Sequence, residues 1–418
     1  MPYSDITGDI PLEEMPAWAK SHLEKLVWKK HDRSILLNRK ILLHSLALGR
    51  QFLLNNQKAA GNFNYQYDFV SGRLDTDDNQ VRQAGTTWGL ALINQYDPTP
   101  TGLGALETAL DFFGKNTHPG PAPGSLLITY PGMDKCDTGT VALVTLALIE
   151  YLRMDKGPNA MLSEGERQKF SERLDGHLAF LCYMHQDSGH FSKSLNLKSK
   201  KRHPRSSPYF DGEALLAMIK AARYLDRSEL IPLIEESAMA MAKFYTHSQW
   251  QKKIDNTTTK GFFQWSCMAY WEYQDAGWKD ADTFGDLLLS LAWWMIHSHR
   301  TLSRGKNTGY VFEGLIPALL VAKARNHEAA IHDLAHTIDI GLRKVTSWQV
   351  GGPLQRRNAL LTSRPTFDPL AFGGIMNARQ EPILRIDVVQ HQMHSVVQAL
   401  RHIYTAPPAK GTSSRVAS

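Results

Sequence analysis

Carboxylate, phenol and imidazole side chains recur near the predicted starts of the apolar helical segments of this sequence. The candidates for proton transfer are Asp137, Tyr209, Asp211, Glu213, Glu313 and His391. Such groups act as general acids and bases when burial or neighbouring charges bring their pKa values toward neutrality. The acidic residues also have a structural explanation, because aspartates cap helices and glutamates in a first turn favour the helix dipole. Catalysis and capping therefore both stay open for them.

The imidazole of His391 follows Asp387 by four residues, which is about one helical turn. That carboxylate could orient the ring as a general base, or the two side chains could form a satisfied pair inside the core. His332 and His336 have the same spacing, but they lie on a predicted outer helix without an HExxH pattern, so solvated histidines are expected there. We therefore predict no metal site and no cofactor.

Two arginines, Arg82 and Arg385, stand at predicted helix starts, where a cation opposes the helix dipole. An anion should compensate each charge, either a neighbouring carboxylate such as Glu213 or Glu313 or an acidic ligand. Aromatic side chains occupy the same region, and their flat faces suit sugar rings, although aromatic residues also fill ordinary helical cores. The predicted substrate-binding residues are Tyr65, Tyr67, Arg82, Trp88, Trp265, Tyr310, Arg379, Arg385 and Asp387.

The apolar pattern around these residues is helical almost throughout, with recurrence at i, i+3, i+4 and i+7. Start and stop signals predict helices at 33–56, 80–95, 103–115, 138–155, 163–184, 209–225, 228–248, 264–274, 280–301, 310–325, 327–347 and 385–404. Every second helix is nearly apolar, whereas its neighbours carry one apolar stripe and a charged face. Six inner helices alternating with six outer ones predict an all-α (α/α)6 toroid of six helical hairpins. An unclosed helical array is the alternative.

An internal repeat supports the closed ring. The segment QKAAGNF, which starts at Gln57, resembles QDSGHF, which starts at Gln186, so 129 residues separate the two glutamines. In each copy an outer helix ends, the chain turns at a glycine, and an inner helix follows. Inner helices of such hairpins run parallel, so their N-termini gather on one rim. The candidate residues named above fall at these N-termini.

The sequence divides into an N-terminal arm at 1–30, a toroid predicted to be catalytic at 31–405, and a disordered tail at 406–418. The longest stretch without a clear helix is 348–384, and loops of this length in a compact domain are often functional. The basic run at 198–205 lacks interleaved aromatic residues, so nucleic-acid binding is not expected.

Length and composition exclude several classes of protein. The chain has 418 residues, of which 43% are hydrophobic and 21% charged, as in ordinary globular proteins. A net charge of +6 permits an acidic substrate without demonstrating one. Apolar runs fall short of the roughly 18 residues that span a membrane, no secretion signal is recognised, and the three cysteines lie far apart. A cytoplasmic protein is expected, and its oligomeric state is not predicted.

Five segments resemble a known family: FNYQYD at 63–68, NQVRQAGTTWGLAL at 79–92, CDTGTVALVTLAL at 136–148, SPYFDGEALLAM at 207–218 and GGIMNARQEPILRIDVVQHQM at 373–393. Over 55–404 the chain resembles the D-glucuronyl C5-epimerase C-terminal-like toroids. Its Q…GxF repeats are also similar to the wider six-hairpin glycosidase and terpene-cyclase toroids.

The resemblance to the epimerases implies a uronic-acid poly- or oligosaccharide in a central groove, whose C5 proton is removed and returned on the other face. Arg82 and Arg385 would neutralise the carbanion that forms beside the sugar carboxylate. The base would be one of two glutamates and the acid one of two tyrosines: Glu213 or Glu313, and Tyr209 or Tyr310.

Three other functions stay open. A six-hairpin glycoside hydrolase or lyase needs two carboxylates, which Asp137, Asp211, Glu213 and Glu313 supply. A terpene-cyclase-like toroid is favoured less, because an aspartate-rich motif is not evident and the DTDD run at 75–78 falls in a predicted loop. The third alternative is a non-catalytic glycan-binding toroid.

Overall fold

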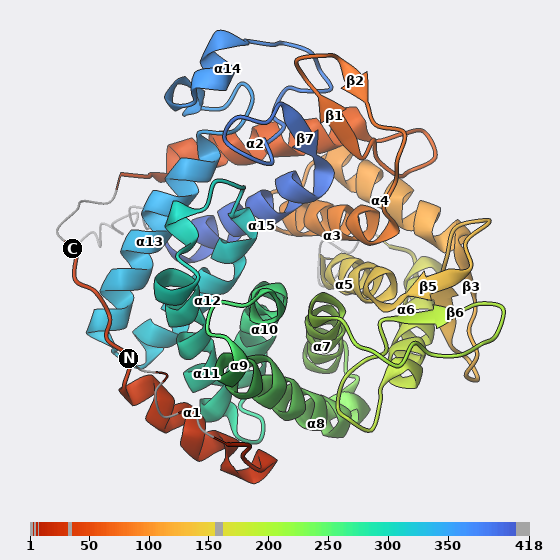
Figure 1. Ribbon diagram of the computed structural model, residues 1–418. Helices are drawn as coiled ribbons and strands as arrows, with labels where there is room; N and C mark the ends of the chain where they lie inside the picture. The colour runs from red at the N-terminus through yellow and green to blue at the C-terminus, as the bar shows by residue number, and fades with distance from the viewer. Residues whose placement is uncertain (1–2, 4–5, 7, 32–35, 155–161, 407–418) are drawn as a thin grey trace, which may run out of the picture.

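Six helices form a closed inner ring in the computed structural model of the protein, which describes residues 3, 6, 8–31, 36–154 and 162–406 (Figure 1). They are α3 (Gln80–Tyr96), α5 (Thr138–Met154), α7 (Pro208–Tyr224), α10 (Thr257–Asp275), α12 (Gly309–Ala324) and α15 (Ile386–His402). Each helix packs against the next in this order, and α15 packs against α3, so the ring closes. The predicted (α/α)6 toroid is confirmed, and the unclosed array is wrong.

In the same described part of the chain, six further helices surround the ring (Figure 1). They are α2 (Arg39–Asn56), α4 (Pro100–Lys115), α6 (Glu164–Met184), α8 (Ile231–Ala242), α11 (Ala281–Trp293) and α13 (Glu328–Thr346). Each packs on the inner helix that precedes it around the ring, as α4 does on α3 and α2 does on α15. Inner helices are thereby covered on all sides, which explains their apolar sequences: every residue of α5 from Thr138 to Leu152 is buried.

Capping side chains set where several helices begin. Asn79 accepts the backbone N–H of Arg82 at the start of α3, and Asn256 plays the same part for α10. Ser163 and Glu166 form a reciprocal capping box at the start of α6. These oxygen atoms satisfy N–H groups that the first turn of a helix leaves unpaired.

Two predicted helix starts differ clearly from the structure, since α2 begins at Arg39, after its cap Asn38, instead of at 33. Helix α10 begins at Thr257, well before the predicted start at 264, because the cap at Asn256 starts the helix there. The sequence TTTK that follows the cap is rich in β-branched residues, which have low helix propensity and disguise the first turn. Gln264 and Trp265 therefore lie in the middle of α10 instead of at its N-terminus.

Short antiparallel sheets connect the hairpins. The first contains β1 (Gln66–Asp68), β2 (Arg73–Leu74) and β7 (Ile383–Arg385) in the order β2-β1-β7; the others pair β3 (Thr117–Pro119) with β4 (Leu126–Ile128) and β5 (Lys135–Asp137) with β6 (Ser194–Asn196). Gln66 of β1 is paired with Arg385 of β7, the residue that precedes α15. This sheet therefore ties the first hairpin of the ring to the last.

The repeated glycine turns have the same architecture in both copies. The Phe63 N–H donates to Gln83 Oε1 at 2.8 Å, and the Phe191 N–H donates to Asp211 Oδ1 at 2.9 Å. Gln83 and Asp211 each lie four residues after the N-cap of their inner helix. The repeat thus anchors each turn to the first turn of the next inner helix.

The predicted N-terminal arm, 1–30, contains helix α1 (Met15–Glu24), which packs on α11. Farther along this arm, the Lys29 N–H donates to Asp333 of α13 at 2.9 Å, so the arm lies along the outer helices. The division into arm, toroid at 31–405 and tail stays a prediction, and residues 407–418 of the tail lie outside the described residues.

The remaining helical pieces are short. Helix α8 continues into the π-helical turn Lys243–Ser248, and α11 continues into the π-helical turn Trp294–Ser298. Short helices lie in the loops: α9 (Gln249–Lys252), α14 (Ala359–Ser363), η1 (Leu12–Glu14), η3 (Ser228–Leu230), η6 (Thr301–Ser303) and η7 (Gln355–Arg357). The long segment at 348–384, which contains η7 and α14, folds back on α2, where Gln349 donates to the Ser45 carbonyl. Among the helices described, we find none with the length and hydropathy that a bilayer crossing requires.

Candidate active site

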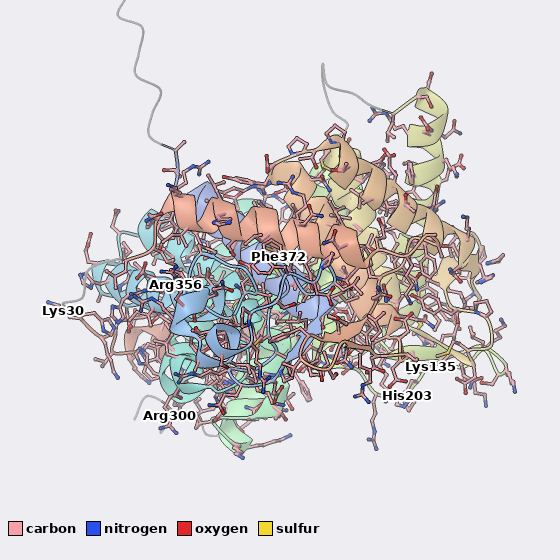
Figure 2. The ribbon with its side chains drawn as sticks, turned by 90° about the horizontal axis from the view of Figure 1, so that it is seen from above. Lys30, Lys135, His203, Arg300, Arg356 and Phe372 are labelled. Carbon is pink, nitrogen blue, oxygen red and sulfur yellow. The ribbon has the colours of Figure 1, made fainter. Side chains whose placement is uncertain are left out.

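A cavity of about 770 Å³ opens at the N-terminal ends of the inner helices. Its wall includes Arg82, Asp137, Tyr209, Glu213, Trp265, Tyr310, Arg385, Asp387 and His391. Figure 2 views the ring side-on, and Lys135, His203 and Arg300, which come from the segments before α5, α7 and α12, project on the same side of the molecule. The parallel inner helices thus bring together residues that are far apart in the sequence.

Glu313, on α12, is fully buried behind this wall. It lies 3.1 Å from His391 Nδ1 and 3.0 Å from His394 Nδ1, both on α15. A carboxylate only accepts hydrogen bonds, so each Nδ1 carries the proton and donates it. Burial alone would raise the pKa of Glu313, but the two histidines outweigh it and lower that pKa, which keeps the carboxylate ionised. Glu313 therefore positions the histidines and does not itself line the cavity.

His391 lines the cavity, and its Nε2 is the ring atom left for a bound molecule because Nδ1 faces Glu313. Burial on its own would lower the pKa of His391, but the charge and hydrogen bond of Glu313 outweigh burial and raise that pKa above its ordinary value. Asp387 does not orient the ring by a hydrogen bond, contrary to the sequence-based expectation. That carboxylate pairs with arginines instead.

Glu213, on α7, is 3% exposed, and its Oε2 has no hydrogen-bond partner among the described residues. Burial raises the pKa of this carboxyl well above its ordinary value, which favours the neutral acid. The indole N–H of Trp265, also in the wall, is likewise unpaired within that part of the chain. Leaving buried polar atoms unpaired is costly, so atoms of this kind that line a cavity are where a ligand gains most by binding.

Glu213 and His391 come from opposite sides of the ring. Counted around the ring from α3, the helix that carries Glu213 is third and the helix that carries His391 is sixth (Figure 1). The cavity therefore has a neutral carboxyl and an imidazole on facing walls. Such a pair can take a proton from one face of a bound molecule and supply a proton to the other face.

Arg82 and Arg385 share one carboxylate. Arg385 contacts Asp387 through Nε at 2.9 Å and also through Nη2, and Arg82 Nε lies 3.4 Å from the same carboxylate. Both guanidinium groups lie over the buried Tyr65 ring, 5.3 and 5.9 Å from its centroid. Two cations that share one anion leave a net positive charge on this wall. The carboxylate that both arginines share is thus Asp387, in place of the Glu213 or Glu313 suggested by the sequence, and the excess charge suits an acidic ligand.

Tyr209 and Tyr310 line the cavity from the first turns of α7 and α12. Burial raises the pKa of both Tyr209 and Tyr310. Both phenols therefore stay protonated and can donate hydrogen bonds to a ligand. Lys260 Nζ lies 5.2 Å from the centroid of the Tyr310 ring.

Three cations of the cavity wall were missed by the sequence reasoning: Lys260, Arg304 and Lys306. The available signal was the basic run RTLSRGK at 300–306, which immediately precedes an inner helix. Arg304 pairs with Asp255 at 3.0 Å, whereas Lys260 and Lys306 have no carboxylate within ion-pair distance in the described ranges. Burial, and next the charge of Arg304, lowers the pKa of Lys260. The wall therefore has an excess of positive charge.

Asp137 and Asp211, both predicted to be catalytic, lie in different places. Asp137 belongs to β5, lines the cavity and accepts a hydrogen bond from Lys135 Nζ at 2.9 Å. Asp211 does not reach the cavity. It is completely buried, accepts the Tyr245 hydroxyl at 2.6 Å and lies 2.6 Å from His190 Nδ1, besides anchoring the glycine turn. The position of Asp211 supports a structural role in place of the predicted catalytic one.

Four of the predicted substrate-binding residues lie outside the wall: Tyr65, Tyr67, Trp88 and Arg379. Tyr67 donates to Asp368, and this hydrogen bond, with burial, raises the pKa of Tyr67 to about 12. Trp88 is buried and meets the ring of His394 edge-on, with centroids 4.9 Å apart. Large aromatic residues in a helical protein fill the core more often than they line a site, which explains the positions of the three aromatic residues. Arg379 comes from the long 348–384 segment and lines a different cavity.

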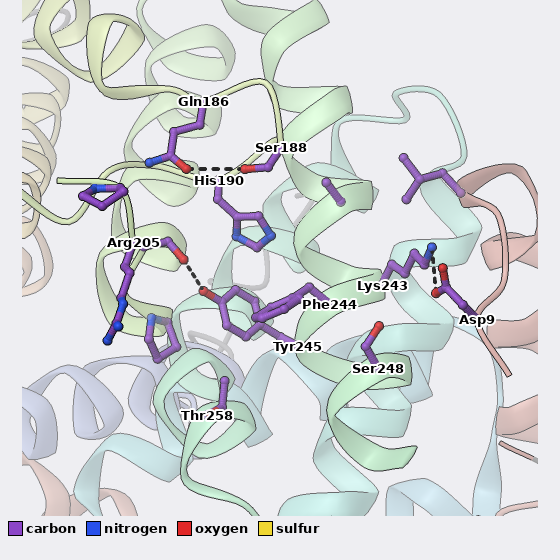
Figure 3. A pocket seen from close by; sticks show the side chains of 15 residues that line it. Asp9, Gln186, Ser188, His190, Arg205, Lys243, Phe244, Tyr245, Ser248 and Thr258 are labelled. Carbon is purple, nitrogen blue, oxygen red and sulfur yellow. Dashed lines mark hydrogen bonds and ion pairs between the residues drawn. The ribbon is translucent and has the colours of Figure 1, made fainter. Parts of the chain in front are cut away.

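A separate cavity of about 720 Å³ lies between the 188–208 loop and the π-helical turn after α8 (Figure 3). His190 and Tyr245 line it, and the ion pair between Lys243 and Asp9 borders it at 3.0 Å. His190 Nδ1 and the Tyr245 hydroxyl already bond to Asp211. In the inner-ring cavity, by contrast, Glu213 Oε2 and the Trp265 indole N–H have no partner among the described residues. Across the described ranges, no group of three or more His, Cys, Asp or Glu side chains is arranged to hold a metal ion.

The fold and the cavity together define a six-hairpin (α/α)6 toroid with acid–base groups at its centre. No protein-family model and no curated protein sequence matches the chain. Solved structures share its fold. It is similar to a D-mannose isomerase (11% identity, TM-score 0.57, covering 87% of this chain and 98% of that one). It is similar also to the cellobiose 2-epimerase from Bacillus thermoamylovorans (11%, 0.56, 85% and 97%) and to a GH76 α-mannanase of Bacteroides thetaiotaomicron (9%, 0.51, 86% and 95%). Identities this low establish the shared toroid alone, so the finer resemblance to C5-epimerase toroids stays a prediction.

Proposed function

We propose that this chain is a carbohydrate-active enzyme that moves a proton at the carbon beside the carboxylate of a uronic-acid sugar, with C5 epimerisation as its reaction. One observation carries the proposal: Glu213 and His391 face each other across a cavity whose wall also holds Arg82 and Arg385. A carbon deprotonated next to a carboxylate spreads its charge onto the carboxylate oxygens, where cations stabilise it. The two arginines are placed for that task.

The two proton carriers take different roles. His391 is the base through Nε2, because the Glu313 carboxylate holds its Nδ1–H. Glu213, kept neutral by burial, is the acid on the opposite wall. The C5–H bond breaks, its proton goes to Nε2, and its electron pair spreads into the sugar carboxylate. The Glu213 proton then forms a new C–H bond on the other face, and exchange with solvent restores both groups.

The remaining wall residues suit sugar binding. Trp265 offers an aromatic surface and an unpaired indole N–H, and Tyr209 and Tyr310 offer phenol donors. Among the solved structures that share the toroid are a D-mannose isomerase and a cellobiose 2-epimerase, whose names specify sugar isomerisation and epimerisation. The excess cations Lys260 and Lys306 favour an acidic sugar over a neutral one.

Deuterium exchange tests this function. Oligosaccharides of glucuronate, galacturonate or mannuronate are incubated with the enzyme in D₂O, and proton NMR follows the C5 resonance. We expect deuterium at C5 together with the epimeric sugar, and rates reduced about 10²- to 10⁴-fold in Glu213→Gln and in His391→Gln. Lys198→Ala, on the exposed loop outside the cavity, is the control and keeps the wild-type rate. Full retention of C5 protons with every uronate contradicts the proposal.

A glycoside hydrolase is the second candidate, favoured by Glu213 and Asp137. They place a neutral carboxyl and an ion-paired carboxylate in one cavity, and two carboxyl groups are the machinery that glycosidic-bond cleavage needs. New reducing ends without deuterium at C5 would favour this reading, and an unsaturated product would favour a lyase. Glycan binding with neither exchange nor cleavage would favour a non-catalytic toroid.

A further inference from the structure

A third cavity, of about 530 Å³, adjoins the cavity of the inner ring. Arg304 and Gly305 line both of these cavities, so the loop before α12 forms a shared wall. Farther from this wall the third cavity is lined by Arg343 and Lys344 of α13, together with Arg357 and Arg379 from the long 348–384 segment. We name this cavity the annex.

The annex is lined by five cations and by no carboxylate among the residues described. Arg304 pairs with Asp255, and Lys344 Nζ donates to the Leu302 and Arg304 carbonyls at 3.2 and 2.5 Å. Since carbonyl oxygens carry no net charge, these hydrogen bonds hold Lys344 in place without neutralising it. The five cations thus line one small volume, with Arg357 and Arg379 exposed and Arg304, Arg343 and Lys344 half-buried.

Four of these cations have no counter-ion in the part of the chain that the structure describes. No carboxylate lies within 4 Å of the charged group of Arg343, Lys344, Arg357 or Arg379 there. Burial, and next the charge of Arg379, lowers the pKa of Lys344, as expected from repulsion between two cations that line one cavity. An anion bound here would relieve this repulsion and gain the planar hydrogen-bonding forks of the arginines.

We propose that the annex binds a second acidic group of the substrate, a carboxylate or a sulfate or phosphate ester, on a sugar next to the one that reacts in the inner-ring cavity. This inference rests on the proposed function, because it assumes an acidic saccharide in that cavity. The shared wall at Arg304 and Gly305 supports one ligand that spans both spaces. The annex then selects oligosaccharides with at least two acidic groups over single uronate units.

The test compares ligands of increasing length by calorimetric titration of the full chain. The probes are glucuronate and its oligosaccharides with two to four acidic groups. Wild-type affinity should rise at least about 10-fold from one acidic group to several, and Arg343→Ala/Arg357→Ala should lose about 10- to 100-fold for the longer probes while keeping its affinity for glucuronate. Lys198→Ala/Lys201→Ala removes the same charge from the exposed loop and should leave both affinities unchanged. Equal losses for short and long probes, or none, overturn the proposal.

A second arm separates failure of the annex from failure of the proposed function. Inorganic phosphate is titrated while the melting temperature is recorded, and it should stabilise the wild type and the loop control but not the annex double variant. If phosphate acts in this way while no uronate binds, the anion site stands and the uronate function fails. If phosphate stabilises the annex variant as much as the wild type, and chain length adds no affinity, the annex is not an anion site.

Discussion

Gly139 of α5 lies directly against the carboxyl of Glu213 on α7: a Cβ atom at position 139 would stand 2.5 Å from Glu213 Oε2 and 2.3 Å from the Phe210 ring. The glycine therefore lets the two helices approach where the acid sits. We expect Gly139→Ala to displace the carboxyl and lower kcat at least about 10-fold, since small displacements of catalytic groups cost up to about 100-fold. Gly104→Ala is the matched control, because nothing lies within 4 Å of its added Cβ. Wild-type kcat in Gly139→Ala would refute the argument.

Glu213 should lower the stability of the folded chain at neutral pH. Burial raises its folded-state pKa, so the folded state binds this proton more tightly than the unfolded state. Stability is then lost as the pH rises above the ordinary carboxyl pKa toward the raised one. We expect Glu213→Gln to melt at a higher temperature than the wild type at pH 7 and at a similar temperature near about pH 4. Thermal melts across this range measure the difference.

The control for that series is Glu24→Gln, which neutralises an exposed carboxylate at the end of α1. Its effect on the melting temperature should be small at every pH. If the difference in melting temperature between Glu213→Gln and the wild type does not vary with pH, protonation of Glu213 is not the cause of that difference.

The pH dependence of activity should report the pairing of Glu313 with His391. Because Glu313 raises the pKa of His391, the neutral base forms only above the ordinary histidine range, and kcat/KM should rise with pH there. Glu313→Gln removes the charge, so this rise should move to lower pH. The variant should also lose at least about 10-fold in kcat, since neutralising the carboxylate of such a pair costs up to about 10⁴-fold. A rate profile from pH 5 to 9 with an unmoved acid limb would contradict the pairing.

Arg385 should contribute to binding and to stability. We expect Arg385→Ala to weaken uronate oligosaccharide binding by about 1.5–3 kcal/mol, the range for a hydrogen bond to a charged group. Lysine should restore only part of the loss, since it lacks the planar fork. The melting temperature should also fall, although Asp387 keeps Arg82 as a partner. Calorimetric titration and melts of the variant, beside exposed Arg73→Ala as control, measure both effects, and unchanged affinity would assign Arg385 to structure alone.

Asp211 should matter for stability and not for chemistry. Asp211→Ala leaves the Phe191 N–H without its acceptor and the Tyr245 hydroxyl with only the 3.4 Å contact to Ser206 Oγ, at a cost of about 1–3 kcal/mol for each buried group that stays unpaired. Gln83→Ala removes the equivalent anchor of the other repeat and should also destabilise the chain. Urea unfolding measures both, with kcat determined on the folded fraction. A lost kcat with unchanged stability would return Asp211 to the list of catalytic candidates.

The ring of helices could be predicted from the sequence because its inner helices are covered on all sides and read as nearly apolar, as α5 does. Residues in or near the first turns of the inner helices could be placed on one rim, because parallel inner helices bring their N-termini together. The pairing of Glu313 with His391 could not, because it joins residues of α12 and α15 that are 78 positions apart. Local spacing favoured Asp387 as the partner, and only the packing of the two helices decides between them.

The anchoring position of Asp211 could also be predicted from the sequence. In the internal repeat it occupies the position of Gln83, a neutral side chain that cannot act as a catalytic acid. A position filled by glutamine in one copy and by aspartate in the other indicates hydrogen bonding to the backbone in both. Comparing the two copies residue by residue would have separated this anchor from the catalytic candidates.

Closure of the ring by α15 has a consequence for how an active molecule is made. Helix α3, its partner in the ring, is translated about three hundred residues earlier, which corresponds to roughly 15–60 s of synthesis. Until α15 docks, the nascent chain holds Glu213 and most of the cavity wall but neither His391 nor Arg385. With the roles proposed above for His391 and Arg385, newly made chains become active only once the last inner helix is in place. During that interval the apolar flanks of α3 and α12 are open to chaperones or to the last helix of another copy.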